Sequence, residues 1–233
     1  MQSTTMLRID IWKLALAVAL VTLSGCSPFR WPNVWPFPEP ERTAFLTPAI
    51  RVDTIRQVAS QADGTDSPEQ RELSDQLGRQ IQIEPDPLVR RAIIHAMTEF
   101  KTPLAQQVLE AGLKDTDAGV RIACCQALGQ RGEALAVGRL AIALRDDRNM
   151  DVRLAAAEAL GKIKSPEAAQ ALIVALDDRD PAMQYVGVES MKSITGEDYG
   201  NDVQTWRQVA AGEKPTNPQE PSIATRLRQM SPF

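Results

Sequence analysis

The apolar residues of this chain recur with a long, regular period. The phrase Val89-Arg90-Arg91-Ala92 returns in similar form 31 residues later at Val120, 32 residues after that at Val152, and more weakly 31 residues further on at Met183. Eight residues after each start lies a large apolar side chain: Met97, Leu128, Leu160 and Met191. A fixed period in this range is typical of a solenoid, in which one supersecondary unit is repeated.

Each copy of the phrase predicts an amphipathic helix, here called a B helix, because apolar residues stand at the start and three, four, seven and eight positions on. An acidic residue precedes or opens each B helix and is expected to cap its free N–H groups; these residues are Asp86, Asp117, Asp151 and Asp180. Gly129 and Gly161 stand at matching places near the ends of two B helices, where C-cap glycines are expected.

Shorter A helices are predicted between the B helices, over residues 104–113, 134–144 and 166–176. Two further helices are predicted ahead of the repeats, over 48–62 and 67–82. The chain is therefore divided into a signal peptide (1–25), a lipidated Cys with a tether (26–46), a leading helix (47–66), the repeats (67–196), a C-terminal cap (197–211) and a mobile tail (212–233).

The Asp…Val-Arg-x-Ala-x-x-x-Ala-Leu-Gly strings at 117–129 and 151–161 resemble HEAT repeats, and specifically the short HEAT-like class of the phycobilisome lyases. The resemblance covers about residues 67–196. It implies an all-α fold, a right-handed α-solenoid of helical hairpins. It also implies that Arg90, Arg121 and Arg153 bond to acidic residues and carbonyls of the adjacent repeat; an anion-binding stripe is the alternative. The resemblance says little about function, because the fold serves scaffolds, adaptors and a few enzymes.

The N-terminus predicts export. Arg8 and Lys13 precede an apolar run over 14–23, too short to span a bilayer but suited to a signal peptide. The run ends in Leu23-Ser24-Gly25-Cys26, which resembles the lipobox of bacterial lipoproteins, where the Cys carries a diacylglyceryl group and an added acyl chain such as palmitate. The resemblance to lipoproteins implies that Ser27, in place of Asp, favours the outer membrane of the cell envelope over the inner membrane. An ordinary secretory signal with a chance Cys is the alternative.

Residues 27–46 contain five prolines and a group of aromatic residues, which predicts an extended, stiff tether. Three roles are open for it: a stalk, a segment whose Trp31 and Trp35 lie among lipid headgroups, or a docking motif for a partner.

Composition narrows the functional classes. A net charge of −4 lacks the basic footprint of nucleic-acid binding. One histidine and three cysteines argue against a zinc, haem or iron–sulfur site, so no metal, cofactor or enzymatic activity is expected. Cys124 and Cys125 are expected to be buried thiols, and the acidic pairs at 146–147 and 177–178 to be solvated turns that cap the following helices.

The sequence predicts a membrane-anchored binding module or scaffold that docks another cell-envelope protein on its concave B-helix face. The residues expected to line its groove are Arg91, His95, Gln126, Glu158, Tyr185 and Glu189. Two alternatives are an enzyme similar to the phycobilin lyases and a structural envelope protein that assembles through the solenoid ends. The oligomeric state is left open.

Overall fold

The computed structural model describes residues 47–213, and in this range the regular structure is helical, without strands. The predicted signal peptide, Cys26, the tether and the tail beyond residue 213 lie outside it. The elements are α2 (Pro48–Ala59), α3 (Pro68–Ile83), α4 (Pro87–Glu99), α5 (Pro103–Gly112), α6 (Ala118–Arg131), η1 (Ala134–Ala136), α7 (Val137–Asp146), α8 (Met150–Ile163), α9 (Pro166–Ala171), α10 (Ile173–Leu176), α11 (Pro181–Thr195) and α12 (Val203–Ala210).

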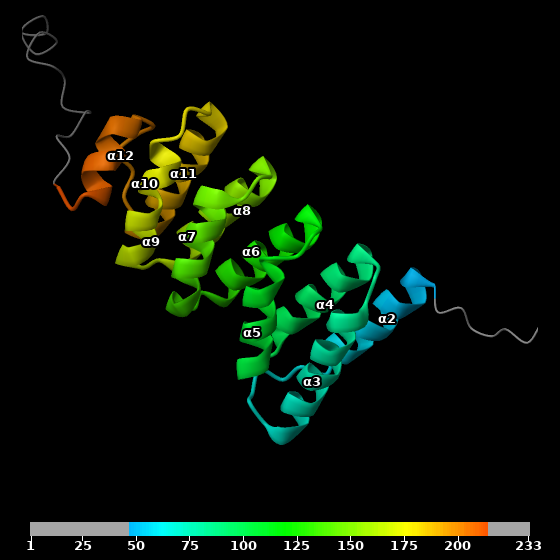
Figure 1. The fold of residues 1–233 in the computed structure, drawn as a ribbon. Coiled ribbons are helices and arrows are strands. Elements are labelled where there is room, and N and C mark those ends of the chain that lie inside the picture. The colour runs from blue at the N-terminus through cyan, green and yellow to red at the C-terminus, as the bar shows by residue number, and fades with distance from the viewer. Residues whose placement is uncertain (1–46, 214–233) are drawn as a thin grey trace, which may run out of the picture. The chain divides into compact units, whose positions relative to one another are not determined.

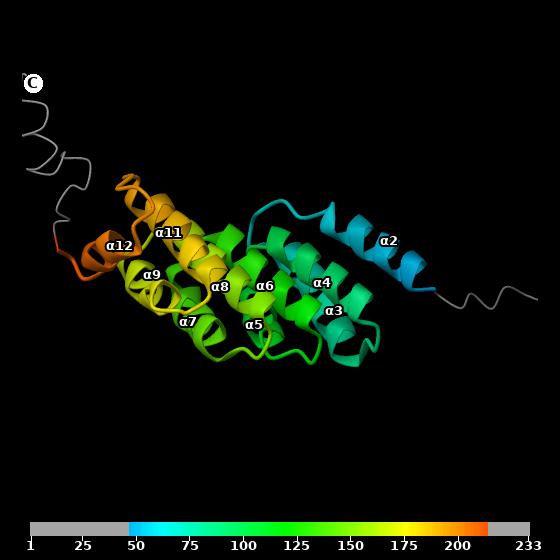
Figure 2. The ribbon, with the colours of Figure 1, turned by 90° about the horizontal axis from the view of Figure 1, so that it is seen from above.

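The helices form an all-α solenoid of two layers (Figures 1 and 2). The B layer consists of α2, α4, α6, α8 and α11, each packed against the next. The A layer consists of α3, α5, α7, the pair α9 and α10, and α12. The predicted leading helix is α2, and it packs directly on α4 as the first member of the B layer.

The predicted helices are confirmed with three differences. The helix expected over 48–62 ends at Ala59, and the other two differences lie in the A layer. The segment expected over 134–144 begins with the 3-10 turn η1 before α7. The segment expected over 166–176 is divided at Leu172, because the N–H of Ala175 bonds to the carbonyl of Leu172 three residues back and tightens the helix there.

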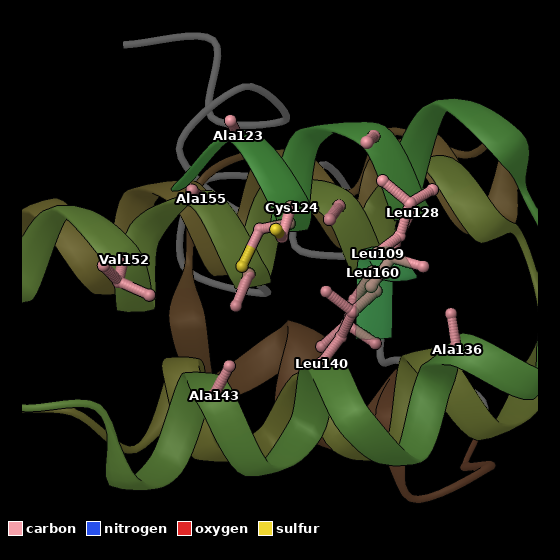
Figure 3. Close-up of a cluster of buried hydrophobic side chains, with 14 of the residues drawn as sticks. Leu109, Ala123, Cys124, Leu128, Ala136, Leu140, Ala143, Val152, Ala155 and Leu160 are labelled. Atoms are coloured by element: carbon pink, nitrogen blue, oxygen red, sulfur yellow. The ribbon is translucent and has the colours of Figure 1, made fainter. Parts of the chain in front are cut away.

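The core lies between the two layers and repeats with the sequence. The four start positions and the four large apolar residues eight positions later are fully buried: Val89, Val120, Val152, Met183, Met97, Leu128, Leu160 and Met191. The A helices contribute their own buried column of Leu109, Leu140 and Leu172. In Figure 3, Leu128 and Leu160 of the B layer and Leu140 of α7 point into the space between the layers.

The prediction of C-cap glycines at Gly129 and Gly161 is wrong. Both lie inside helices, and the left-handed residues that end these helices are Gly132 (φ 70°) and Lys164 (φ 52°). A Cβ on Gly129 would lie 2.7 Å from Cα of Ala159 in α8, and a Cβ on Gly161 would lie 2.7 Å from Cβ of Ser190 in α11. These glycines are therefore required for the close approach of successive B helices.

Replacing Gly129 or Gly161 by alanine should lower the free energy of unfolding by about 1–3 kcal/mol, because neither α8 nor α11 can yield to the added methyl group without moving backbone. The control is Gly138→Ala in α7, where nothing lies within 4 Å and alanine should be neutral or stabilise by up to about 1 kcal/mol. Urea denaturation of the three variants measures the difference. Equal stabilities would contradict the close-approach interpretation.

Candidate functional site

The turn before each B helix contains the residue that caps the helix, and this cap determines where the helix begins. Asp86, Asp117 and Asp180 accept backbone N–H groups of the first turn and are the predicted N-caps. Asp151 is not: the cap of α8 is Asn149, whose side chain accepts the N–H groups of Asp151 and Val152. Asn149 lies three residues before the start position of its repeat, as the other three caps do. The predicted cap, Asp151, lies two residues further along the chain and was wrong.

A second acidic position, two residues before each cap, binds the cap's own N–H. These residues are Glu84, Asp115, Asp147 and Asp178, and each carboxylate oxygen lies 2.8–3.0 Å from the N–H nitrogen two residues on. The prediction of a solvated pair at 146–147 is therefore wrong for Asp147, whose side chain is only 9% exposed.

Arginines join these turns from repeat to repeat. Arg90 makes two hydrogen bonds to Asp115, both 2.8 Å long, and Arg121 makes two to Asp147, 2.7 and 2.9 Å long. Each guanidinium also donates backwards, to the carbonyl six residues earlier. The bonds to acidic residues of the adjacent repeat that the resemblance implied are thus present for these two arginines, but the carbonyls that they bind belong to the turn before their own helix. We call this set of turns and arginines the arginine ladder.

The third arginine departs from the prediction. Arg153 donates to the carbonyl of Asp147 but has no carboxylate partner among residues 47–213, since its second nitrogen contacts Sδ of Met150. In the next repeat Gln184 takes the arginine position and donates to the carbonyl of Asp178. The ladder therefore carries ion pairs only in its N-terminal half.

The ladder holds the B helices in register and lines up one exposed residue from each. His95, Gln126, Glu158 and Glu189 are all exposed, each six positions after the buried start position of its repeat (Val89, Val120, Val152 and Met183). Arg51 of α2 bonds to Glu84 as Arg90 bonds to Asp115, so Arg56 holds the equivalent place in α2. We call Arg56, His95, Gln126, Glu158 and Glu189 the polar column.

Two hollows open along this column. The first, of about 550 Å³, lies between α2 and α4 and is lined by Arg56, Arg91, His95 and Glu99 over an apolar floor that includes Ala92. The predicted groove residues Arg91 and His95 thus share one site. No ion pair involves Arg91 within residues 47–213.

The second hollow, of about 280 Å³, lies between α8 and α11 and is lined by Glu158, Lys162, Tyr185 and Glu189. Tyr185 stands at its edge with 61% of its surface exposed. Three predicted groove residues therefore meet here, and Gln126 lies on α6 between the two hollows. Lys162 and Arg56 were not among the predicted groove residues. Arg56 has no sequence signal because α2 stands outside the regular period.

The groups that titrate near neutral pH are few. The side chain of His95 is exposed along the column but partly enclosed by the α2–α4 hollow, and this partial burial lowers its pKa; the positive charge of Arg91 lowers it further. Cys124 and Cys125 are fully buried, as predicted; burial raises the pKa of Cys125 to about 12 and that of Cys124 well above its ordinary value. The described residues bring together no group of three His, Cys, Asp or Glu side chains able to hold a metal ion. No helix among them is both long and apolar enough to cross a bilayer.

Comparison with known proteins agrees with the repeat pattern. A family model described as HEAT repeats matches residues 73–155 and 137–204, which together make up more than half of the chain. No curated protein matches the sequence.

Arg121→Ala should lower the free energy of unfolding by about 3 kcal/mol, because it leaves the nearly buried Asp147 without its cation. Arg145→Ala is the matched control: its pair with Asp146 is more than half exposed and should contribute less than about 1 kcal/mol. Urea denaturation measures both. Equal losses would contradict a special role for the ladder.

The same variant should be less sensitive to acid. Burial raises the pKa of Asp147, but the hydrogen bonds from Arg121 and from the N–H of Asn149 outweigh it and hold the pKa below 3.8. A lowered folded-state pKa stabilises the protein above about pH 4, and this contribution is lost as the pH falls through the folded value. In Arg121→Ala that part of the acid dependence should shrink.

The imidazole of His95 should titrate below pH 6.5, and Arg91→Gln should move its midpoint upward without reaching 6.5, since burial remains. His95 is the single histidine of the chain, so its ring signals in NMR report the titration directly. Arg145→Gln, on an exposed site of α7, should leave the midpoint unchanged. An unaltered midpoint in Arg91→Gln would place the two groups too far apart to interact.

Proposed function

The chain belongs to the family of HEAT-repeat proteins, whose helical repeats serve as scaffolds and interaction modules, and on that basis we propose that it docks another cell-envelope protein on the outward face of its B layer. A lipid on Cys26 would hold it at a membrane, with the outer membrane favoured by Ser27. No catalytic role is part of this proposal.

One observation carries the docking proposal: the side chains of the polar column are exposed in register, and two hollows open beside them with an apolar floor and charged edges. Interface cores combine such apolar and aromatic surface with a polar edge. Tyr185, which is largely exposed at the edge of the second hollow, is the type of residue that contributes strongly to binding.

The ends of the solenoid favour docking over assembly by end-to-end stacking. At the C-terminal end, α12 buries Trp206 completely, and its indole N–H donates to the carbonyl of Gly200. Beside it, Lys192 contacts Asp198 and Asn201 of the loop that follows α11. The exposed positions of α2 at the other end include Asp53 and Gln57. Ile50 of α2 is also 46% exposed, so the capping by a polar surface is clearer at the C-terminal end, where it suits the closed end of a repeat array.

Docking predicts that the triple variant Gln126→Ala, Glu158→Ala, Glu189→Ala loses its partner while remaining folded, because all three side chains are exposed. In-cell crosslinking of the tagged protein followed by mass spectrometry measures capture. The control is Gln107→Ala, Arg139→Ala, Gln170→Ala, a column of exposed residues on the A layer, which should capture the partner as wild type does. Retention of the partner by the first variant, with unchanged helicity and melting temperature, would refute docking on the B layer.

Lipid anchoring predicts that Cys26→Ser moves the protein from the membrane fraction to the soluble fraction and abolishes labelling by palmitate. Each buried CH₂ contributes about 0.8 kcal/mol, so two or three acyl chains hold a protein at a membrane nearly permanently. Ser27→Ala is the neighbouring control and should remain membrane-bound. Membrane association of Cys26→Ser equal to that of wild type would exclude the lipid as the anchor.

A further inference from the structure

The charges of the polar column change sign along the solenoid. The column begins with the guanidinium of Arg56, passes through the imidazole of His95 and the uncharged amide of Gln126, and ends with the carboxylates of Glu158 and Glu189. Arg91, which lines the α2–α4 hollow beside His95, adds a second positive charge to the first end.

The charges that determine this order are only partly neutralised within the described residues. Arg91 at one end and Glu158 at the other have no ion pair among residues 47–213. Arg56 pairs with Asp53 across a contact in which both side chains are about two-thirds exposed or more, and such pairs are weak. Glu189 pairs with Lys192 at 2.9 Å, so Glu158 is the principal negative charge of the α8–α11 hollow.

One helical turn away the order is reversed. Glu99 lines the α2–α4 hollow and Lys162 lines the α8–α11 hollow, each four residues after the column residue of its helix. Four residues of α-helix span about 6 Å, so a segment displaced by one turn would meet charges of the opposite sign. The favourable order of charges is thus confined to a narrow path along the polar column.

We propose that the polar column binds an extended polypeptide segment of the partner that carries an acidic side chain at the α2–α4 hollow and a basic side chain at the α8–α11 hollow. This inference rests on the proposed docking function and adds the chemistry and the orientation of the docked segment. Complementary charges of this kind fix register and exclude wrong partners more than they add affinity.

The spacing of the two charges in the segment follows from the packing. Three steps between neighbouring B helices separate the hollows, and helices pack about 8–10 Å apart, which gives about 24–30 Å. An extended chain advances about 3.3 Å per residue, so the acidic and basic side chains should be about eight residues apart. The uncharged middle of the segment would then cross α6 at Gln126.

A synthetic peptide tests the orientation. It carries two glutamates at one end and two lysines at the other, separated by about eight uncharged residues, with a nitroxide on a cysteine at either end. The readout is paramagnetic broadening of the ring signals of His95, the single histidine of the chain, in the α2–α4 hollow. The nitroxide at the acidic end should broaden these signals several-fold more than the nitroxide at the basic end.

A charge-swapped protein sharpens the test. The variant Arg56→Glu, Arg91→Glu, Glu158→Lys, Glu189→Lys keeps His95 and changes only exposed positions, and its helicity and melting temperature are checked first. In it the peptide should reverse, so that the nitroxide at the basic end broadens His95 more. Salt at about 1 M, where the Debye length is about 3 Å, should remove the preference in both proteins.

Three results would overturn the proposal: equal broadening from the two ends, no broadening from either, or a preference that survives the charge swap. These results are distinct from failure of the docking function. If crosslinking shows a partner that is lost from the alanine triple variant while the peptide shows no preferred end, the B layer docks a partner but the order of charges does not select it.

Discussion

The arginine ladder is the interaction on which the arrangement of the B layer depends. Arg90 and Arg121 each make four hydrogen bonds to two sets of acceptors, the carbonyls of their own turn and the carboxylate of the next turn. The carboxylate in turn holds the N–H of the residue that caps the following helix. Because one group connects the start of one B helix to the start of the next, successive helices cannot rotate independently. The exposed faces of α4, α6 and α8 are aligned for this reason.

Much of this fold follows from the sequence, because the apolar residues that recur with the repeat period are the ones that must be buried between the two layers. Val89, Val120, Val152 and Met183 were recognisable from spacing alone and are all fully buried. Residues with alternative roles were harder to place. Asp151 is a residue type that often caps helices. The cap is nevertheless Asn149, because Asn149 lies at the same position of its repeat as the other caps do. Gly129 and Gly161 stand near helix ends as cap glycines do, and only the distance to the next helix shows that they serve close packing.

The exposed residues of the polar column could be predicted from the sequence, but the shape of the surface around them could not. Exposure of His95, Gln126, Glu158 and Glu189 followed from helical periodicity, whereas the division of the face into two hollows depends on side-chain sizes across neighbouring helices. The sequence does not indicate the role of Arg56, because the longer connection after α2 interrupts the repeat period. Its position in the column follows from the hydrogen bond between Arg51 and Glu84. The order of charges along the column could therefore be determined only from the sequence and the packing together.

The position of Cys124 and Cys125 has a consequence for how the molecule opens. Both thiols lie in α6, with helices of the solenoid stacked on either side, and Sγ of Cys124 fills the space that a side chain at position 112 would need. In a one-dimensional array of repeats the ends can fray while the centre stays closed. A reagent that modifies thiols would therefore react with Cys124 and Cys125 only when the central helices separate. The rate of this reaction would measure how often the separation occurs. In oxidising surroundings the lifetime of the closed centre would also set how long Cys124 and Cys125 remain free thiols.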